Sequence, residues 1–156
     1  TSTLTTGASS TAGTITGDWS LSSGSRMDAT YADLAERYAA DMSYEPGTVL
    51  VFGGDEEVTV TNTKGDRRMA GVVSTNPAYS MNKECVGEHV VELALQGRVP
   101  CKVLGAVRKG DMLVASAMPG YAIVDNDPKT GSVIGKSLTH KADDNKGIIE
   151  VAVGRL

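Results

Sequence analysis

From Thr48 to the C-terminus, turn-forming residues divide the chain into short apolar runs, and this division is what most limits its fold. Gly-centred or Pro-containing turns recur about every ten residues, and the runs between them are rich in Val, Ile, Leu and Thr. Such runs are typical of β-strands bounded by turns. The sequence predicts nine strands, at 48–52, 57–61, 69–74, 89–95, 99–107, 112–116, 121–124, 132–138 and 148–153. Many short strands at this spacing indicate a mainly β fold, a compact β-barrel or sandwich.

Two stretches of this strand region resemble each other. Gly47-Thr-Val-Leu50-Val51 matches Gly110-Asp-Met-Leu113-Val114 at an offset of 63, and Ala70-Gly71 parallels Ile134-Gly135 at about the same offset. An internal duplication of a hairpin-plus-strand unit is the simplest account, and two such units would pack as pseudo-symmetric halves of one barrel. Chance similarity between two hairpins rich in Gly and Val is the alternative.

One α-helix is predicted, from Asp28 to about Met42. Asp28 is a suitable N-cap, because its carboxylate can accept hydrogen bonds from the free amides of a first turn. Apolar residues follow at helical spacing and would form a single stripe, namely Tyr31, Leu34, Ala35, Tyr38 and Met42. Pro46-Gly47 would end any helix that reached it.

The first 25 residues have a different composition from the rest. They contain seven Thr, seven Ser and four Gly, with Asp18 as the only charge. A flexible Gly/Ser-rich linker is one interpretation. The other is a strand that needs a partner, because Ile15, Trp19 and Leu21 are interleaved with polar residues and Thr favours strands. We therefore divide the chain into a Ser/Thr/Gly-rich lead, residues 1–27, and a globular β-rich domain, residues 28–156.

Composition and motifs disfavour several functions. The net charge of −4 gives no excess of cations for binding nucleic acid or an anionic membrane. No apolar run approaches the length of a membrane span, so membrane insertion is not expected. His89 and His140 lie far apart with no ligand cluster beside them, and Cys85 and Cys101 are expected to be reduced thiols. No metal and no cofactor is therefore expected.

The candidate catalytic residues are Asp33 and Glu36, which would share one face of the predicted helix. Two close carboxylates can push their pKa values apart, so that one donates a proton while the other stays ionised. That pair is the minimum needed for acid/base cleavage of an amide. The alternative is an ordinary solvated helix face, with no enzymatic role.

Longer strings of the domain form recognisable motifs. They are Ala29-Thr-Tyr-Ala-Asp-Leu-Ala-Glu36-Arg-Tyr38, Tyr44-Glu-Pro-Gly-Thr-Val-Leu-Val-Phe-Gly-Gly54, Ala70-Gly-Val-Val-Ser-Thr-Asn-Pro77, Leu95-Gln-Gly-Arg-Val-Pro-Cys-Lys102, Arg108-Lys-Gly-Asp-Met-Leu-Val114 and Ile149-Glu-Val-Ala-Val-Gly-Arg155. Together they resemble the C-terminal domain of fibre and virion structural proteins of tailed phages, especially T4-like and marine phages. In the lead, Gly17-Asp-Trp-Ser-Leu21 looks like the end of a fibre shaft.

This resemblance implies a virion structural protein that is assembled in the host cytoplasm. Its partners would be two further copies of itself, in a homotrimer, and other virion fibre proteins. A trimeric end domain would align three weakly patterned shafts, whose pairing register is otherwise poorly specified. The expected trimer contacts are Ile15, Trp19 and Leu21 near the three-fold axis, and Tyr31, Leu34, Tyr38 and Met42 against the barrel or a neighbour.

Two alternatives follow from related resemblances. A more distant similarity, to the self-cleaving intramolecular chaperone domains of phage appendage proteins, implies that Asp33 and Glu36 are the acids and that the cut lies between Trp19 and Asp28. A host-receptor or glycan-binding tip is the other alternative. Its candidate ligand-binding residues are the aromatic side chains Tyr44, Tyr79 and Tyr121, which would stack on sugars.

Overall fold

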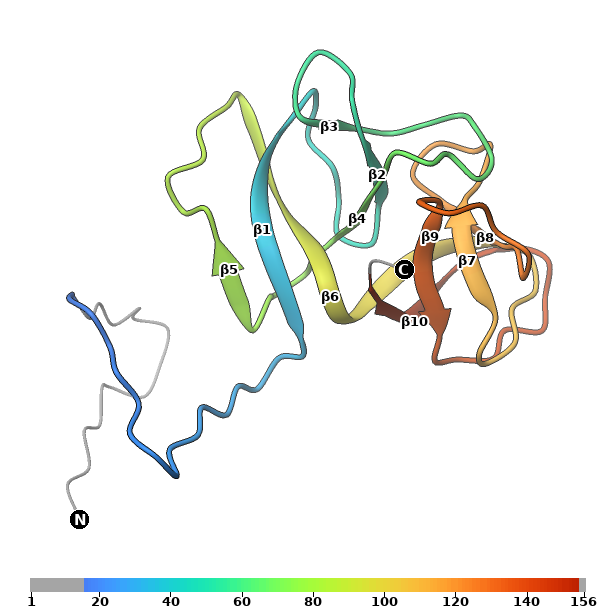
Figure 1. Cartoon of the computed structure of the whole chain (residues 1–156). Coiled ribbons are helices and arrows are strands. Elements are labelled where there is room, and N and C mark those ends of the chain that lie inside the picture. Colours follow the sequence, from blue (N-terminus) through green and yellow to red (C-terminus); the bar gives the residue numbers. More distant parts are fainter. Residues whose placement is uncertain (1–15, 155–156) are drawn as a thin grey trace.

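The long strand β6 (His89–Leu104) joins two closed rings of strands, as the computed structural model shows (Figure 1). The structure describes residues 16–154, and within them it contains ten strands and no helix. The other strands are β1 (Asp33–Ala40), β2 (Val49–Phe52), β3 (Val58–Thr59), β4 (Met69–Val73), β5 (Tyr79–Met81), β7 (Met112–Ala115), β8 (Ala122–Val124), β9 (Val133–Ser137) and β10 (Lys146–Val153). The expectation of a mainly β fold with a barrel is thereby confirmed.

Each ring closes through five strands. In the N-terminal ring, β1, β3, β2, β4 and the first half of β6 are hydrogen-bonded in that order, and β6 returns to β1. In the C-terminal ring, the second half of β6 is followed by β8, β7, β9 and β10, and β10 returns to β6. Strand β5 lies outside the N-terminal ring, where it pairs in parallel with β1.

The two rings repeat one pattern of pairing, including its irregularities. Leu50 of β2 lies opposite Gly71 of β4, and the register shifts directly after Leu50. Leu113 of β7 lies opposite Gly135 of β9, and the register shifts directly after Leu113. A bulge that recurs at the same place in two units indicates that the fold requires it there. The two matched stretches therefore pair alike, and their origin in an internal duplication stays a prediction.

The repeat extends to the first and last strands of each ring. The parallel bridge that closes the N-terminal ring joins Ala40 to Val58, and the one that closes the C-terminal ring joins Val103 to Ala122. Strand β1 thus corresponds to the second half of β6, and the first half of β6 corresponds to β10. The two units follow each other along the chain, and each closes its own ring instead of supplying half of a single barrel.

The hydrophobic core consists of two clusters, and the cluster of the C-terminal ring extends onto strands of the N-terminal ring. Leu50, Val58 and Leu93 fill the N-terminal ring and are fully buried. Val49 of β2 and Val72 of β4 belong instead to the cluster that fills the C-terminal ring, although Ala70 and Val73 of β4 belong to the N-terminal one. Strands β2 and β4 therefore bury both of their faces, which explains why they are continuous apolar runs without polar alternation.

The helix predicted over residues 28–42 is wrong, because residues 33–40 form the strand β1. Its neighbours are β6 on one side and β5 and β3 on the other, so its backbone hydrogen bonds are made between strands. The small residue Ala35 lies opposite Ala94 and is fully buried. Helical propensity is a weak preference that such long-range pairing overrides, and the apolar spacing of this segment fits period two at Ala35 and Ala39 as well as period 3.6.

The break predicted between the strands at 89–95 and 99–107 is also wrong, because the chain continues through Gln96-Gly97-Arg98 as one strand. Gly97 has a φ of 110°, in a region that favours glycine, and β6 changes direction near this point (Figure 1). A Cβ at Gly97 would collide with the carbonyl oxygen of Ala32. Gly97 therefore allows β6 to bend from one ring into the other while β1 approaches it closely.

Replacing Gly71 or Gly135 by Ala should destabilise the protein by similar amounts, roughly 1–3 kcal/mol. A Cβ at Gly71 would meet the carbonyl oxygen of Ala94, and a Cβ at Gly135 would meet that of Ala152, the equivalent contact in the other ring. Urea unfolding of the two variants measures this cost. Gly154→Ala is the control, because no atom lies within 4 Å of the added Cβ. Two unequal effects, with one variant as stable as the unchanged protein, would contradict the structural equivalence of the two sites.

Candidate functional site

A pocket of about 290 Å³ opens where the two rings meet. We call it the junction pocket. At this junction Gly97 of β6 pairs on one side with Asp33, at the start of β1, and on the other with Val153, near the end of β10. The rim therefore combines residues of both rings with the segment that leads into β1, residues that are far apart in the sequence.

Asp33 is the buried acid of the junction pocket. Its side chain is only 6% exposed, and its Oδ2 atom has no hydrogen-bond partner in the described part of the chain. Burial raises the pKa of this carboxyl above its ordinary value, although a hydrogen bond with Ser74 opposes the shift. The negative charge of Glu92 raises the pKa further.

The backbone around Asp33 is fixed on both sides. The amide of Ala78 donates to the carbonyl oxygen of Asp33 over 2.8 Å, and the amide of Arg98 donates to the carbonyl of Ala32 over 3.0 Å. Because these bonds anchor the start of β1, the Asp33 side chain is held in place even though one of its oxygens has no partner.

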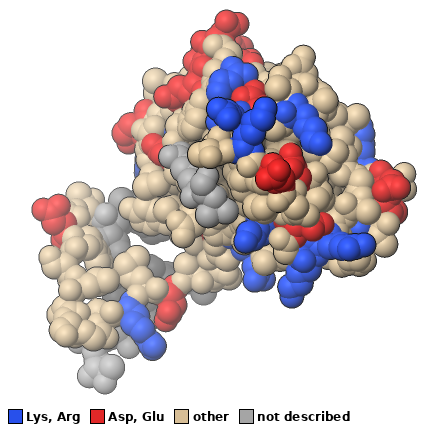
Figure 2. Space-filling view, turned by 45° about the vertical axis from the view of Figure 1, so that its right-hand side comes forward, with Lys and Arg blue, Asp and Glu red and all other residues tan. Residues whose placement is uncertain are grey.

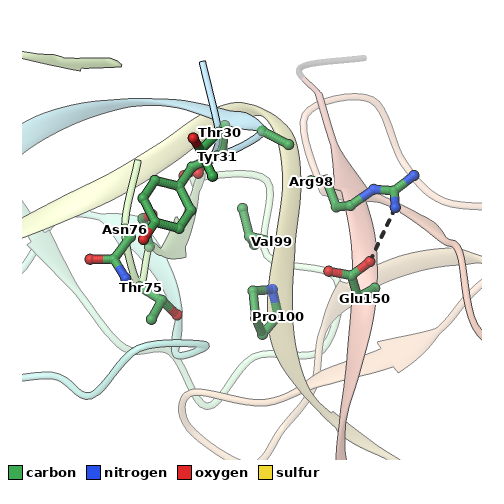
Figure 3. Close-up of a pocket in the computed structure, with 11 residues that line it drawn as sticks. Thr30, Tyr31, Thr75, Asn76, Arg98, Val99, Pro100 and Glu150 are labelled. Atoms are coloured by element: carbon green, nitrogen blue, oxygen red, sulfur yellow. Dashed lines mark ion pairs between the residues drawn. The ribbon is translucent and has the colours of Figure 1, made fainter. Parts of the chain in front are cut away.

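The walls of the pocket differ in chemistry. Tyr31, Thr75 and Asn76 lie on one side, and Arg98 and Glu150 lie on the other (Figure 3). The Nη1 atom of Arg98 is 3.5 Å from Oε2 of Glu150, and both side chains are about half exposed. Val99 and Pro100 form the apolar surface between the two sides (Figure 3).

This arrangement is suited to binding through hydrogen bonds. Its polar groups are a carboxyl, a guanidinium, an amide and hydroxyls, and the described lining includes neither His nor Cys. Asp33 can accept a hydrogen bond when ionised and donate one when protonated. An unpartnered buried carboxylate is costly, and here the folded protein bears that cost because the Oδ2 atom of Asp33 is sealed from solvent.

Glu36, the second candidate acid, does not join Asp33. Residues three apart on a strand point to opposite faces, so the expected shared face disappears with the helix. Oε2 of Glu36 instead accepts a hydrogen bond of 2.8 Å from the hydroxyl of Tyr38. The structure thus separates the predicted acidic pair and leaves a single buried carboxyl in the pocket.

The three tyrosines predicted to bind sugars lie on separate elements. The hydroxyl of Tyr44 donates to Oδ1 of Asp41 over 2.5 Å. The Nζ atom of Lys146 lies 5.1 Å from the centre of the Tyr121 ring, while Tyr79 on β5 is exposed. None of the three lines the junction pocket, and their role in sugar binding stays a prediction.

The residues predicted to make trimer contacts are divided between two environments. Trp19, Leu21, Tyr31, Leu34 and Met42 are exposed, as such contacts require in a single chain. Tyr38 instead packs edge-to-face on Phe52, with ring centres 5.7 Å apart. Ile15 lies outside the described residues. The trimer role of these residues stays a prediction.

The two cysteines and the other residue types that can bind metals show no sign of a reactive or metal-binding site in the described residues. Cys101 is fully buried, which raises the pKa of its thiol to about 12, and burial also raises the pKa of Cys85. Within residues 16–154, no three His, Cys, Asp or Glu side chains are placed to hold a metal ion. The same range contains no helix that is long and apolar enough to cross a membrane.

Sequence reasoning did not identify Ser74, Asn76, Arg98 or Glu150 as site residues. Two of them stand out when the repeated units are compared. The first unit has Ser74 where the second has Leu138, and the second has Arg98 where the first has Ala35. Polar residues at positions where the other repeated unit has an apolar residue are therefore the sequence signal that indicates these site residues.

Asp33→Asn should make the protein more stable than the unchanged chain at pH 7, and this advantage should shrink as the pH falls toward 4. The reason is that burial raises the pKa of Asp33, so folding takes up a proton just above the unfolded pKa and the penalty for the charged form grows with pH. Urea unfolding at several pH values measures the difference.

Asp66→Asn is the matched control with the opposite sign. Arg68, whose Nη2 atom is 2.8 Å from the Asp66 carboxylate, holds the pKa of Asp66 well below its ordinary value. This variant should lose roughly 1–2 kcal/mol at pH 7, and the loss should fade as the pH drops below about 4. If Asp33→Asn were also less stable at pH 7, the Asp33 carboxylate would be satisfied by its surroundings.

Comparisons with known proteins do not assign the chain to a family. A scan against protein-family models finds no match, and a search of curated proteins finds no significant one. What the protein does must therefore be inferred from its exposed segments and from the junction pocket.

Proposed function

We propose that the chain is a structural end domain of a viral fibre that assembles as a homotrimer. The observation that supports this most directly is the extended segment, residues 16–32, which has no strand or helix and leads away from the rings (Figure 1). Its large apolar side chains are exposed, namely Trp19, Leu21, Met27 and Tyr31. Exposed apolar side chains gathered in one segment mark a surface that a partner covers.

The rings do not cover these side chains, because their cores are filled by their own residues. Both clusters of buried residues are built from strands of residues 33–153 and the loops between them. A second and third copy of the chain would bring the same extended segment alongside the first. Association would then bury apolar area at roughly 25 cal/mol per Å².

The charge distribution is consistent with assembly through the extended segment. Lys, Arg, Asp and Glu of both signs are interspersed over the face of the rings seen in Figure 2, and the segment below them carries few charges. Its charged residues are Asp18, Arg26 and Asp28. Three such segments can approach one another with little repulsion, whereas highly charged strands could not.

The resemblance to tailed-phage proteins supplies the setting for this trimer. The domain would end a fibre whose Ser- and Thr-rich shaft cannot set its own pairing register. Three linked domains would align the three shafts and raise their effective concentration. The remaining partners would be other virion fibre proteins and a receptor on the host surface.

Self-cleavage is the second candidate function, and one observation favours it. Asp33 lies at the base of the extended segment, and its raised pKa lets it keep a proton at a higher pH than an ordinary aspartate. A chain extended at its N-terminus, expressed intact and unchanged by Asp33→Asn, would exclude this function. A precursor that is cut between Trp19 and Asp28 only when Asp33 is present would establish it.

Native mass spectrometry of the chain should give a mass near three times 16.2 kDa. The double variant Trp19→Ser, Leu21→Ser should shift the population toward monomer, because both side chains would be buried between copies. Removing two such side chains costs several kcal/mol of association energy, of order 1.5–3 kcal/mol for each.

Val86→Ser is the control for this experiment. Val86 is the most exposed large apolar residue among residues 16–154, at 85%, and it lies in the loop between β5 and β6 rather than in the extended segment. Its replacement should leave the trimer intact. A folded monomer for the unchanged chain at micromolar concentration would refute the proposed assembly.

A further inference from the structure

Strand β5 differs from the other strands because it has a neighbour on one side only. Within residues 16–154, every other strand pairs with at least two others, since both rings are closed. β5 pairs only with β1, so its second edge faces outward from the N-terminal ring (Figure 1). The unpaired N–H and C=O groups of such an edge can pair with a further strand.

The free edge of β5 lacks the side chains that usually protect an edge. Natural proteins block exposed edges with Lys, Pro or charged residues, and Tyr79-Ser80-Met81 contains none of these. Tyr79 lies opposite Leu34 of β1, and opposite residues of a sheet share a face. Both side chains are exposed, Tyr79 at 59% and Leu34 at 37%. An apolar face that the rings leave uncovered therefore borders the free edge.

The length of β5 limits which strand would pair with it. Three residues offer few hydrogen bonds, and very short edge strands are themselves a protection against chance association. An unrelated chain in solution would gain little from this edge. A strand that is kept nearby by other contacts has a high effective concentration and needs few bonds. A segment of a second copy in the same assembly meets that condition.

Residues 18–22 of the extended segment have the pattern of such a strand. Polar and apolar residues alternate in this run, which places Trp19 and Leu21 on one face of an extended chain. Gly17 and Gly24 flank the run, with φ values of 117° and 86° that favour glycine. The run pairs with no strand among the described residues of its own chain.

The run and the free edge match in chemistry and in reach. With Ser20 opposite Ser80, the apolar neighbours of both serines fall on one face in either strand direction. Aromatic and aliphatic pairs across strands stabilise a sheet. Residues 23–32 separate the run from β1 and can span roughly 33 Å when extended. A domain of this size has a radius of gyration of roughly 14 Å, so the run can reach a neighbour.

We propose that residues 18–22 of one copy add as a strand to the free edge of β5 in a neighbouring copy, with Ser20 opposite Ser80. This inference rests on the proposed homotrimer and states where its extended segments bind. Each chain offers one run and one edge, so the contact is head-to-tail, and three such contacts close a ring. The apolar side of the run is then covered by the apolar face beside β5.

The test is cross-linking of the full chain through cysteines at the two serines. Ser20→Cys and Ser80→Cys are combined in a Cys85→Ser background, because Cys85 is partly exposed whereas Cys101 is buried. Opposite Cβ atoms in a sheet lie about 4.5–5.5 Å apart, slightly more than in a disulfide, so a short bismaleimide is used beside mild oxidation. Denaturing gels should show covalent dimers and closed trimers.

Three matched variants in the same background control for chance collisions. Ser20→Cys alone and Ser80→Cys alone should remain monomers on the gel. Ser20→Cys combined with Thr130→Cys should also remain monomeric, because Thr130 is exposed in the loop between β8 and β9 of the other ring.

Tyr79→Ser tests the apolar part of the contact without changing the extended segment. In native mass spectrometry it should raise the midpoint concentration of trimer formation about tenfold or more, because apolar area buried on association is lost. Tyr79 belongs to neither core cluster, so the rings should stay folded, which circular dichroism checks. Val86→Ser, in the loop that follows β5, should leave the midpoint unchanged. An unchanged midpoint for Tyr79→Ser would contradict the proposed contact.

Three cross-linking results would overturn this pairing. They are no cross-link in the double variant, cross-linking of Ser20→Cys alone at the level of the double variant, and a cross-link confined to the monomer band. The second would mean that the segments pack on one another, and the third that each run folds back onto its own β5. Native mass spectrometry of the same samples keeps the two proposals apart. A trimer with any of these results refutes only the pairing, whereas a folded monomer refutes both.

Discussion

Strand β6 is hydrogen-bonded to strands of both rings, and the rest of the architecture depends on its passing unbroken between them. Gly97 makes this possible, because it pairs with Asp33 of β1 on one side and with Val153 of β10 on the other. Its lack of a Cβ lets the backbone at Ala32 come close. Two rings that share a strand cannot move apart, so the residues at their junction keep fixed positions. A pocket between two separate domains joined by a linker would have no such constraint.

The strands could be predicted from the sequence where turn residues next to them mark their ends. Turn residues such as Gly110-Asp111 and Met118-Pro119-Gly120 mark the ends of β7 and the start of β8, and these boundaries agree with the structure to within a residue or two. The segment containing β1 could not be predicted in this way. Its Ala and Leu residues favour a helix locally, and only pairing with β6, whose partner residues lie 49 to 64 positions further along the chain, makes it a strand.

The candidate site could be predicted only in part, for the same reason. The sequence points to Asp33 through a helical partnership with Glu36 that does not exist, yet the fold does bury this acid. Its actual neighbours, Ser74 and Arg98, are brought to it by β4 and β6. The spacing of residues in the sequence does not predict those contacts. A comparison of the two repeated units does point to them, since residues that differ between the units, such as Ser74 and Arg98, lie at the junction.

The unmet requirements of the chain lie in two places, and their chemistry differs. Trp19 and Leu21 lack apolar cover, which a copy of the same segment can supply without any specific pocket. Asp33 lacks a single directional partner, which apolar association cannot supply. Tyr31 lies next to both, being exposed in the extended segment and also part of the pocket rim. Any packing of the segments that turns the Tyr31 ring toward a neighbouring chain removes a wall of the pocket. Packing that leaves the ring in place keeps the wall, so the way in which the proposed trimer packs would decide whether the junction pocket stays open.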